Sequence, residues 1–201
     1  MQEAQEETKF ASRNYVLLVQ NLMLQAGIQL HDLDFIAASS GPAPFTTLRV
    51  SLASLNGLAF ARQIPLVGVN GLECFTLEQK DDIYSQTLVL LNAFAGDLYV
   101  GLYDTSAQRV IAIKCMPFAL LADFIREKNS TIKCVGGGAE LYREQLCKLN
   151  PLLSIPEDNP ATCSLQSVAL HGLQQWNTDT RIWRRQLMPL YLKNHPVQNS
   201  L

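Results

Sequence analysis

The sequence predicts an α/β fold with two halves, because a strand–helix–strand unit comes first and an antiparallel meander follows. The first unit has strand patterns at 35–39 and 65–70 with a helical pattern at 46–62 between them. Such a unit normally forms a parallel strand pair with a right-handed crossover. The meander is predicted from three short strand patterns separated by turn-rich segments, at 87–92, 97–103 and 109–114.

Three domain segments follow from this pattern. Residues 1–82 are expected to form the first half and 83–163 the second, and 164–201 a C-terminal helix and tail that pack back on the body. In the second half, a helix that begins near Pro117 leads to the strand TIKCV, a GGG turn and the helix AELYREQLCKL. Ser164 is the predicted N-cap of the last helix.

Composition indicates a folded cytoplasmic protein without a strong attraction to nucleic acid. Hydrophobic residues make up 48% of the chain, charged residues only 17%, and the net charge is -2. A contact with RNA would therefore be local or supplied by a partner. The five cysteines are odd in number and widely spaced, as expected for reduced thiols in a core. No apolar run is long enough to predict a membrane span.

The first predicted helix, Tyr15–Ala26, has apolar residues around most of its circumference and ends at Gly27. We expect it to be buried on two sides. The helix at 46–62 has two faces that differ in kind. The core stripe consists of Leu48, Leu52, Leu55 and Ala59. The opposite face carries small side chains, namely Thr47, Val50, Ser54, Gly57 and Ala61. A face of small side chains lets another helix approach closely.

Two segments that contain glycine are candidates for phosphate binding. In GPAPFTTLR, which runs from Gly41 to Arg49, Pro42 and Pro44 each remove a backbone N–H, so we interpret this segment as a turn that positions a helix. The second candidate follows a strand and opens a helix, at Gly136, Gly137 and Gly138. It is either a weak nucleotide site or a tight turn that allows close packing.

The polar side chains predict no catalytic or metal site. The three histidines, His31, His171 and His195, lie far apart, and no pair of carboxylates has a spacing typical of acid–base catalysis. We therefore expect no catalytic residue, no metal and no cofactor. Positive charge is concentrated only near the C-terminus, at Arg181, Arg184 and Arg185 with Lys193 nearby. These arginines form either an ordinary surface stretch with salt bridges or a patch that faces RNA.

Residues 26–73 closely resemble the signature region of the bacterial TsaB (YeaZ) family, whose members take part in making threonylcarbamoyladenosine on tRNA. The family pattern is close to GPGSFTGLR followed by a small-residue helix and an IPLVGVSSLE strand. The resemblance continues more weakly through VLLNAFAGDLYVGLYD, VGGGAELY and PLYLK.

The resemblance implies an actin-like fold of the sugar-kinase type, with two related α/β domains. It implies a scaffold that is not itself an enzyme, which pairs with the catalytic TsaD subunit, with the ATPase TsaE in the wider complex and tRNA bound indirectly. The pairing surface would comprise Leu18, Leu22, Thr47, Val50, Ser54, Gly57 and Ala61. The motif loop would comprise Gly41, Pro42, Phe45, Thr46 and Arg49. Without its partner, the small-residue face is expected to pair two copies of the chain.

The sequence departs from the family pattern at three places. Ala43, Pro44 and Thr47 stand where the family usually has Gly, Ser and Gly. The DARKGEVY-type motif is altered at Asn92, Phe94 and Ala95. The family's N-terminal strands with their DTS-like sequence are expected to be missing, which would lower nucleotide binding and leave a sheet edge uncovered.

A start codon assigned too late and a divergent form stabilised by its partner both explain the missing strands. Two other functions remain open from the sequence: a glycoprotease-type hydrolase of the M22-like class, and a self-sufficient actin-like ATPase.

Overall fold

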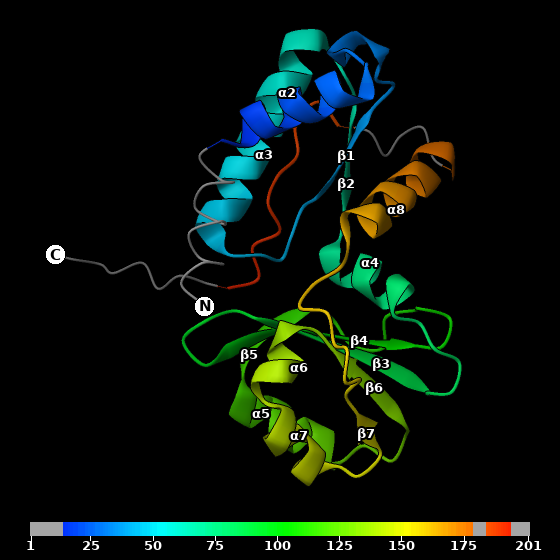
Figure 1. Ribbon diagram of the computed structural model, residues 1–201. Coiled ribbons are helices and arrows are strands. Elements are labelled where there is room, and N and C mark those ends of the chain that lie inside the picture. The colour runs from blue at the N-terminus through cyan, green and yellow to red at the C-terminus, as the bar shows by residue number, and fades with distance from the viewer. Residues whose placement is uncertain (1–13, 179–183, 194–201) are drawn as a thin grey trace, which may run out of the picture. The chain divides into compact units, whose positions relative to one another are not determined.

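The computed structural model describes residues 14–178 and 184–193, which fall into two compact units (Figure 1). Unit 1 contains the chain up to Asn70 together with Val168–Leu190. Unit 2 contains Gly71–Ser167 and the segment that begins at Tyr191. The sequence suggested boundaries at residues 82 and 163, which separate two related actin-like halves and a C-terminal segment. These boundaries stay a prediction.

Unit 1 is built on a parallel pair of strands, β1 (Ile36–Ser39) and β2 (Leu66–Val69). Their register pairs Ile36 with Leu66 and Ser39 with Val69. Helix α3 (Phe45–Arg62) connects the two strands. The predicted strand–helix–strand unit is therefore confirmed.

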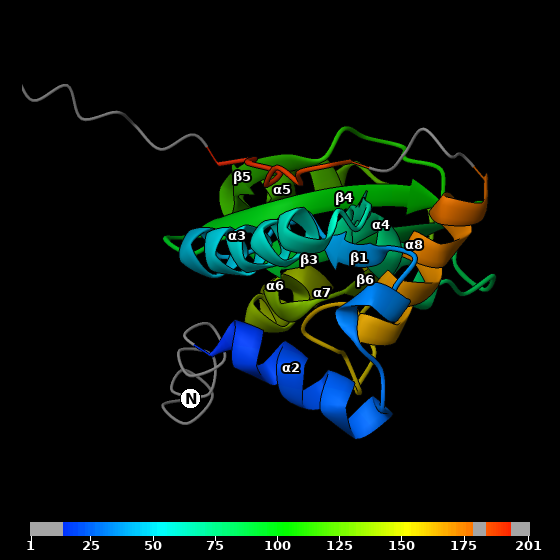
Figure 2. The same ribbon diagram turned by 90° about the horizontal axis from the view of Figure 1, so that it is seen from above.

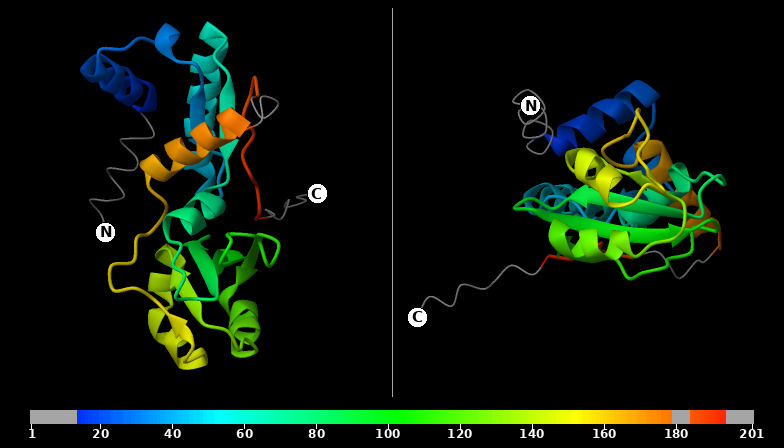
Figure 3. Two further views of the ribbon diagram at one scale, coloured as in Figure 1. Left: turned by 90° about the vertical axis from the view of Figure 1, so that its right-hand side faces the viewer. Right: turned by 90° about the horizontal axis from the view of Figure 1, so that it is seen from below.

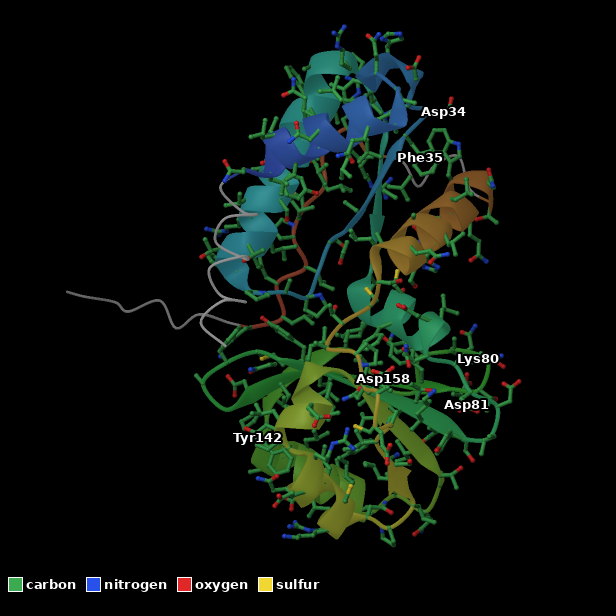
Figure 4. The ribbon with its side chains drawn as sticks, in the orientation of Figure 1. Asp34, Phe35, Lys80, Asp81, Tyr142 and Asp158 are labelled. Carbon is green, nitrogen blue, oxygen red and sulfur yellow. The ribbon has the colours of Figure 1, made fainter. Side chains whose placement is uncertain are left out.

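Helices α3 and α8 (Leu165–Thr178) cover opposite faces of this strand pair, as Figure 2 shows. On the α3 side, the predicted core stripe is buried together with Ala38, Leu66 and Leu187. On the α8 side, helix and sheet approach so closely that a Cβ on Gly172 would lie 2.4 Å from the Cβ of Ala37. The ring of Phe35 stacks on Trp176 of α8 with centroids 4.9 Å apart (Figure 4).

Helix α2 (Tyr15–Ala26) has the predicted bounds and ends at Gly27, whose φ of 67° is left-handed. The prediction that this helix is buried on two sides is wrong, since none of its residues is buried. The reason is that α3 and α8 already cover both faces of the strand pair. Helix α2 packs against α3 instead, on the outside of unit 1 (Figure 3). A short 3-10 helix, Leu30–Asp32, joins it to β1.

Unit 2 contains a five-stranded mixed sheet in the order β5-β4-β3-β6-β7. The β3–β4 and β4–β5 pairs are antiparallel, and the β3–β6 and β6–β7 pairs are parallel. The bounds are Gln86–Asn92 for β3, Asp97–Asp104 for β4, Lys114–Pro117 for β5, Ile132–Val135 for β6 and Leu153–Ser154 for β7.

The third strand of the meander begins later than the predicted 109–114. Val110 and Ile111 both direct their backbone N–H groups at the carbonyl oxygen of Leu102, at 2.8 and 3.5 Å. Two donors that share one acceptor make the chain bulge away from regular pairing. The ladder with β4 resumes only where Lys114 pairs with Val100.

Helices cover both faces of the sheet of unit 2. Helix α4 (Gly71–Glu78), which the sequence analysis did not predict, packs Leu72 and Phe75 against Val89, Tyr103 and Val135. The other face carries three helices, α5 (Phe118–Arg126), α6 (Gly137–Leu141) and α7 (Arg143–Leu149).

The helix predicted after the GGG turn is in fact the pair α6 and α7, which is interrupted at Tyr142. The ring of Tyr142 stacks on Phe118 at 4.0 Å (Figure 4). The backbone N–H of Ser167 donates to the hydroxyl of Ser164 at 3.0 Å, which confirms the predicted N-cap of α8. Within the described ranges, no helix has the length and apolar character needed to cross a bilayer.

Candidate functional site

Helix α2 presents large apolar side chains to solvent. Leu22 and Leu24 are 64% and 71% exposed, and Leu18 is also exposed. Val16, Leu17 and the nearby Ile28 extend this apolar surface. Many exposed large apolar side chains on one helix are typical of an element that binds another protein.

The small-residue face of α3 is open to solvent at its C-terminal end. Thr47, Val50 and Ser54 are half-buried, whereas Gly57 and Ala61 are exposed. A Cβ built on Gly57 would meet no atom within 4 Å. The Ser54 hydroxyl donates to the carbonyl oxygen of Val50 at 2.8 Å, so its hydrogen-bonding potential is met within the helix.

An apolar groove of about 300 Å³ lies between the two helices. Its lining includes Val16, Val19, Met23 and Leu24 from α2 and Leu58 from α3. We define the exposed or half-buried residues Leu18, Leu22, Thr47, Val50, Ser54, Gly57 and Ala61, together with this groove, as the α2–α3 surface. The groove residues were not predicted from the sequence, and only the apolar character of α2 around most of its circumference could have indicated them.

The motif loop has the geometry of a turn at the start of α3. Gly41 is buried with a φ of 110°, and a Cβ at this position would lie 2.9 Å from Cδ2 of Leu48. Its N–H donates to the Ser39 hydroxyl at 3.2 Å, and Pro42 and Pro44 have no N–H to offer. The loop therefore uses its glycine for close packing on α3 and for the turn itself.

The remaining residues of the motif loop lie on the surface of α3. Phe45, Thr46 and Arg49 are exposed, and the guanidinium carbon of Arg49 lies 3.7 Å from the centroid of the Phe45 ring. Such a cation–π contact fixes both side chains on the first turns of the helix. The structure thus separates a buried part of the motif, Gly41 and Pro42, from an exposed part.

The second glycine segment packs tightly against β3 in unit 2. The N–H of Gly136 donates to Oδ1 of Asn159 at 2.9 Å, and that of Gly137 donates to the carbonyl oxygen of Ala161 at 2.9 Å. Cβ atoms on Gly136 and Gly138 would lie 2.3 and 2.9 Å from the carbonyl oxygen of Leu90. These contacts favour the close-packing interpretation over a phosphate site, because two of the three donors are already used.

The hairpin turn between β3 and β4, where the sequence departs from the family motif, is held by polar contacts within unit 2. Asn92 accepts a hydrogen bond from the Phe94 N–H at 2.8 Å, and Phe94 and Ala95 both have left-handed backbones. The ammonium group of Lys193 lies 2.8 Å from Asp97 and donates to the carbonyl oxygens of Ala93 and Phe94. The hydrogen bond to Asp97 raises the pKa of Lys193.

The arginine cluster lies partly in the described chain. Arg181 falls outside the described residues, and Arg184 and Arg185 are exposed next to β2 in unit 1. Among residues 14–178 and 184–193, no group of three or more His, Cys, Asp or Glu side chains is arranged to hold a metal ion.

The fold agrees with the comparisons to known proteins. Residues 7–148 match the family model described as TsaD, tRNA N6-adenosine threonylcarbamoyltransferase. The chain is 31% identical over 87 residues to the tRNA threonylcarbamoyladenosine biosynthesis protein TsaB of Buchnera aphidicola, a match that covers 43% of this chain and 41% of that protein. It is 39% identical over 69 residues to the tRNA N6-adenosine threonylcarbamoyltransferase of Syntrophus aciditrophicus, covering 32% of this chain and 20% of that protein.

A solved structure of YeaZ from Pseudomonas aeruginosa superposes with a TM-score of 0.65 at 18% identity and covers 90% of this chain and 85% of that one. The protein therefore has the actin-like α/β fold that the sequence predicted. The chain belongs to the TsaD family that matches residues 7–148, and its TsaB and YeaZ relatives confirm the resemblance seen in the sequence. It spans less than half the length of the curated relatives that it matches.

Proposed function

We propose that this chain is a non-catalytic subunit that binds a TsaD-like threonylcarbamoyltransferase through the α2–α3 surface during formation of threonylcarbamoyladenosine on tRNA. The observation that carries the proposal is helix α2, which is apolar yet contains no buried residue. A partner that fully buried side chains such as Leu22 and Leu24 would gain about 1.5–3 kcal/mol of binding free energy for each one. The occupant we propose is a TsaD-like protein because the curated relatives bear the names TsaB and tRNA N6-adenosine threonylcarbamoyltransferase.

The shape of α3 also fits a partner that approaches with a helix. The exposed Gly57 and Ala61 leave room for a helix to approach the backbone of α3, while the large side chains of α2 lie alongside. The backbone N–H groups of Gly136 and Gly137 further support a scaffold role, because they already donate hydrogen bonds within unit 2. They are therefore not available to bind the phosphates that an ATPase would need. In this role tRNA and a TsaE-like ATPase meet the chain as parts of the wider complex.

Co-expression of the chain with the TsaD-like protein of the same organism, followed by affinity capture and size-exclusion chromatography, tests this function. The wild-type chain is expected to give a stoichiometric complex. Leu22→Glu should weaken capture by about 100-fold or more, because a carboxylate would be buried without a partner. Leu120→Glu is the matched control, since Leu120 is 62% exposed on α5 of unit 2, and it should leave capture unchanged.

A second pair of variants tests the small-residue face. Gly57→Leu is expected to abolish capture by blocking helix approach, while leaving the fold intact because no atom of the chain lies near its Cβ position. Gly57→Ala should keep capture within about tenfold. Capture that survives both Leu22→Glu and Gly57→Leu would overturn the proposal. Without the partner, we propose that the same surface pairs two copies of the chain, so Leu22→Glu should convert any dimer to a monomer.

A further inference from the structure

A second groove lies in unit 1, at the C-terminal end of α3, and shares no residue with the α2–α3 surface. Its volume is about 290 Å³, and its lining includes Phe60, Gln63, Pro65, Arg184 and Arg185. The ring of Phe60 is 76% exposed, and both arginines are exposed. None of the described side chains that line the groove is acidic.

The two arginines are held by backbone contacts on both sides. The N–H of Arg184 donates to the carbonyl oxygen of Leu66 in the buried strand β2 at 2.8 Å, and the N–H of Leu66 donates back to Arg184 at 3.0 Å. Three residues further, Leu187 is buried, and the side chain of Asn56 donates to its carbonyl oxygen and accepts from its N–H, at 3.0 and 2.8 Å. The segment that carries the arginines is thus anchored to β2 and to α3, and the guanidinium groups start from a fixed backbone.

We propose that this groove binds a segment of RNA, with phosphates on Arg184 and Arg185 and an unpaired base stacked on Phe60. Guanidinium groups match phosphate oxygens in two-point hydrogen bonding, and an exposed aromatic ring provides a platform for a base of any sequence. The net charge of -2 gives the chain no general attraction for RNA, so a contact has to come from such a local site. The identification of the ligand as RNA rests on the proposed role in tRNA modification.

An acidic peptide could also pair with the two arginines, but it would not use the exposed ring of Phe60, which lines the same groove. RNA uses both features, because each nucleotide supplies one phosphate and one flat base. The chemistry of the groove therefore favours RNA over an acidic protein segment.

Fluorescence anisotropy with the full chain and a labelled, unmodified tRNA transcript tests the proposal over a range of KCl concentrations. For two phosphate contacts on a single strand, the logarithm of the association constant should fall with the logarithm of salt at a slope of about -1.4. Arg185→Gln should reduce this slope to about -0.7. Phe60→Ala should lower affinity by about fivefold or more without changing the slope.

Three controls make the result specific. Phe60→Tyr keeps an aromatic ring and should restore binding, and Arg126→Gln removes an exposed arginine from α5 of unit 2 and should change nothing. A labelled polyglutamate peptide serves as the acidic competitor. Any of three results would overturn the proposal. The first is that Arg185→Gln and Phe60→Ala leave tRNA affinity unchanged, and the second is that the wild-type chain does not bind tRNA. The third is that polyglutamate binds as strongly as tRNA and loses affinity equally in both variants.

The test is separable from that of the proposed function. Suppose that the wild-type chain fails to capture the TsaD-like protein, while its tRNA binding depends on Phe60 and Arg185. This result would overturn only the scaffold role. Normal partner capture by Arg185→Gln and Phe60→Ala, combined with unchanged tRNA affinity, would overturn only the RNA groove.

Discussion

Helices α2 and α5 are similarly apolar but differ in burial. In α5, Leu121 and Ile125 are fully buried against the sheet of unit 2, whereas in α2 no residue is buried. The difference lies in what each unit offers: the sheet of unit 2 has a face for α5, while both faces of the β1–β2 pair in unit 1 are taken by α3 and α8. Apolar composition thus indicates that a helix face needs a partner, but not that the partner is in the same chain.

The largest effect is expected where unit 2 is packed most tightly. Gly136→Ala would place a Cβ 2.3 Å from the carbonyl oxygen of Leu90 on a backbone with a φ of 104°. We expect the free energy of unfolding to fall by about 3 kcal/mol or more, because both the clash and the left-handed backbone oppose a side chain. Urea denaturation followed by far-ultraviolet circular dichroism measures the loss. Wild-type stability in this variant would show that the GGG turn is not closely packed.

The contrast between the two helices can be measured directly by making a Leu→Ala substitution in each of them. Leu121→Ala on α5 removes a fully buried side chain and should destabilise the protein by about 2–5 kcal/mol. Leu24→Ala on α2 removes a side chain that is 71% exposed and should change stability by no more than about 0.5 kcal/mol. If urea denaturation gave equal losses in the free energy of unfolding for the two variants, α2 would be buried in the free protein and would not differ from α5.

Alkaline pH should destabilise unit 2 in particular, since all five cysteines lie between residues 74 and 163. Burial raises the pKa of the Cys74 thiol to about 12 and also raises that of Cys134. Below the thiol pKa of the unfolded chain, about 8.5, these groups are neutral in both states. Above it, the unfolded chain loses a proton that the folded protein keeps, so the free energy of unfolding falls as pH rises, by up to about 1.4 kcal/mol per pH unit per thiol.

Urea titrations between pH 8 and 11 measure this slope. Cys74→Ala should flatten it, whereas Cys147→Ala, which replaces an exposed thiol, should leave it as in the wild-type protein. A slope that is the same in Cys74→Ala and in the wild-type protein would contradict the burial of this thiol.

A small gain in stability, opposite in sign to the loss expected at Gly136, is expected at Gly57. Gly57→Ala should stabilise the free chain by about 0.5–1 kcal/mol, because alanine is the better helix former and its Cβ meets no atom. Thermal unfolding of the chain without a partner measures the gain. A loss of stability would mean that the backbone at Gly57 is already packed.

Much of the fold was predictable from local patterns. The bounds of α2 and the strand–helix–strand unit followed from apolar periodicity, Gly27 and turn residues, and the cap of α8 followed from Ser164. Helix α4 and the late start of β5 were missed, because tertiary packing of Phe75 and the shared acceptor at Leu102 decide them. Local patterns carry no information on such contacts.

The candidate site was predictable in chemistry but not in exposure. Spacing placed Gly57 and Ala61 on one face of α3, yet only the structure gives the open space around Gly57 and the groove beside α2. The groove at Phe60 depends on a contact between Leu66 and Arg184, which are far apart in the sequence. Long-range pairing of this kind cannot be inferred from one sequence.

Hydrogen exchange of the chain, measured with and without the TsaD-like protein of the same organism, tests whether helices α2 and α3 bind this partner. We expect the partner to slow exchange in peptides from residues 15–26 and 45–62, and to leave peptides from residues 86–104 in the sheet of unit 2 unchanged. A complex that protects unit 2 while α2 and α3 exchange as in the free chain would contradict this expectation.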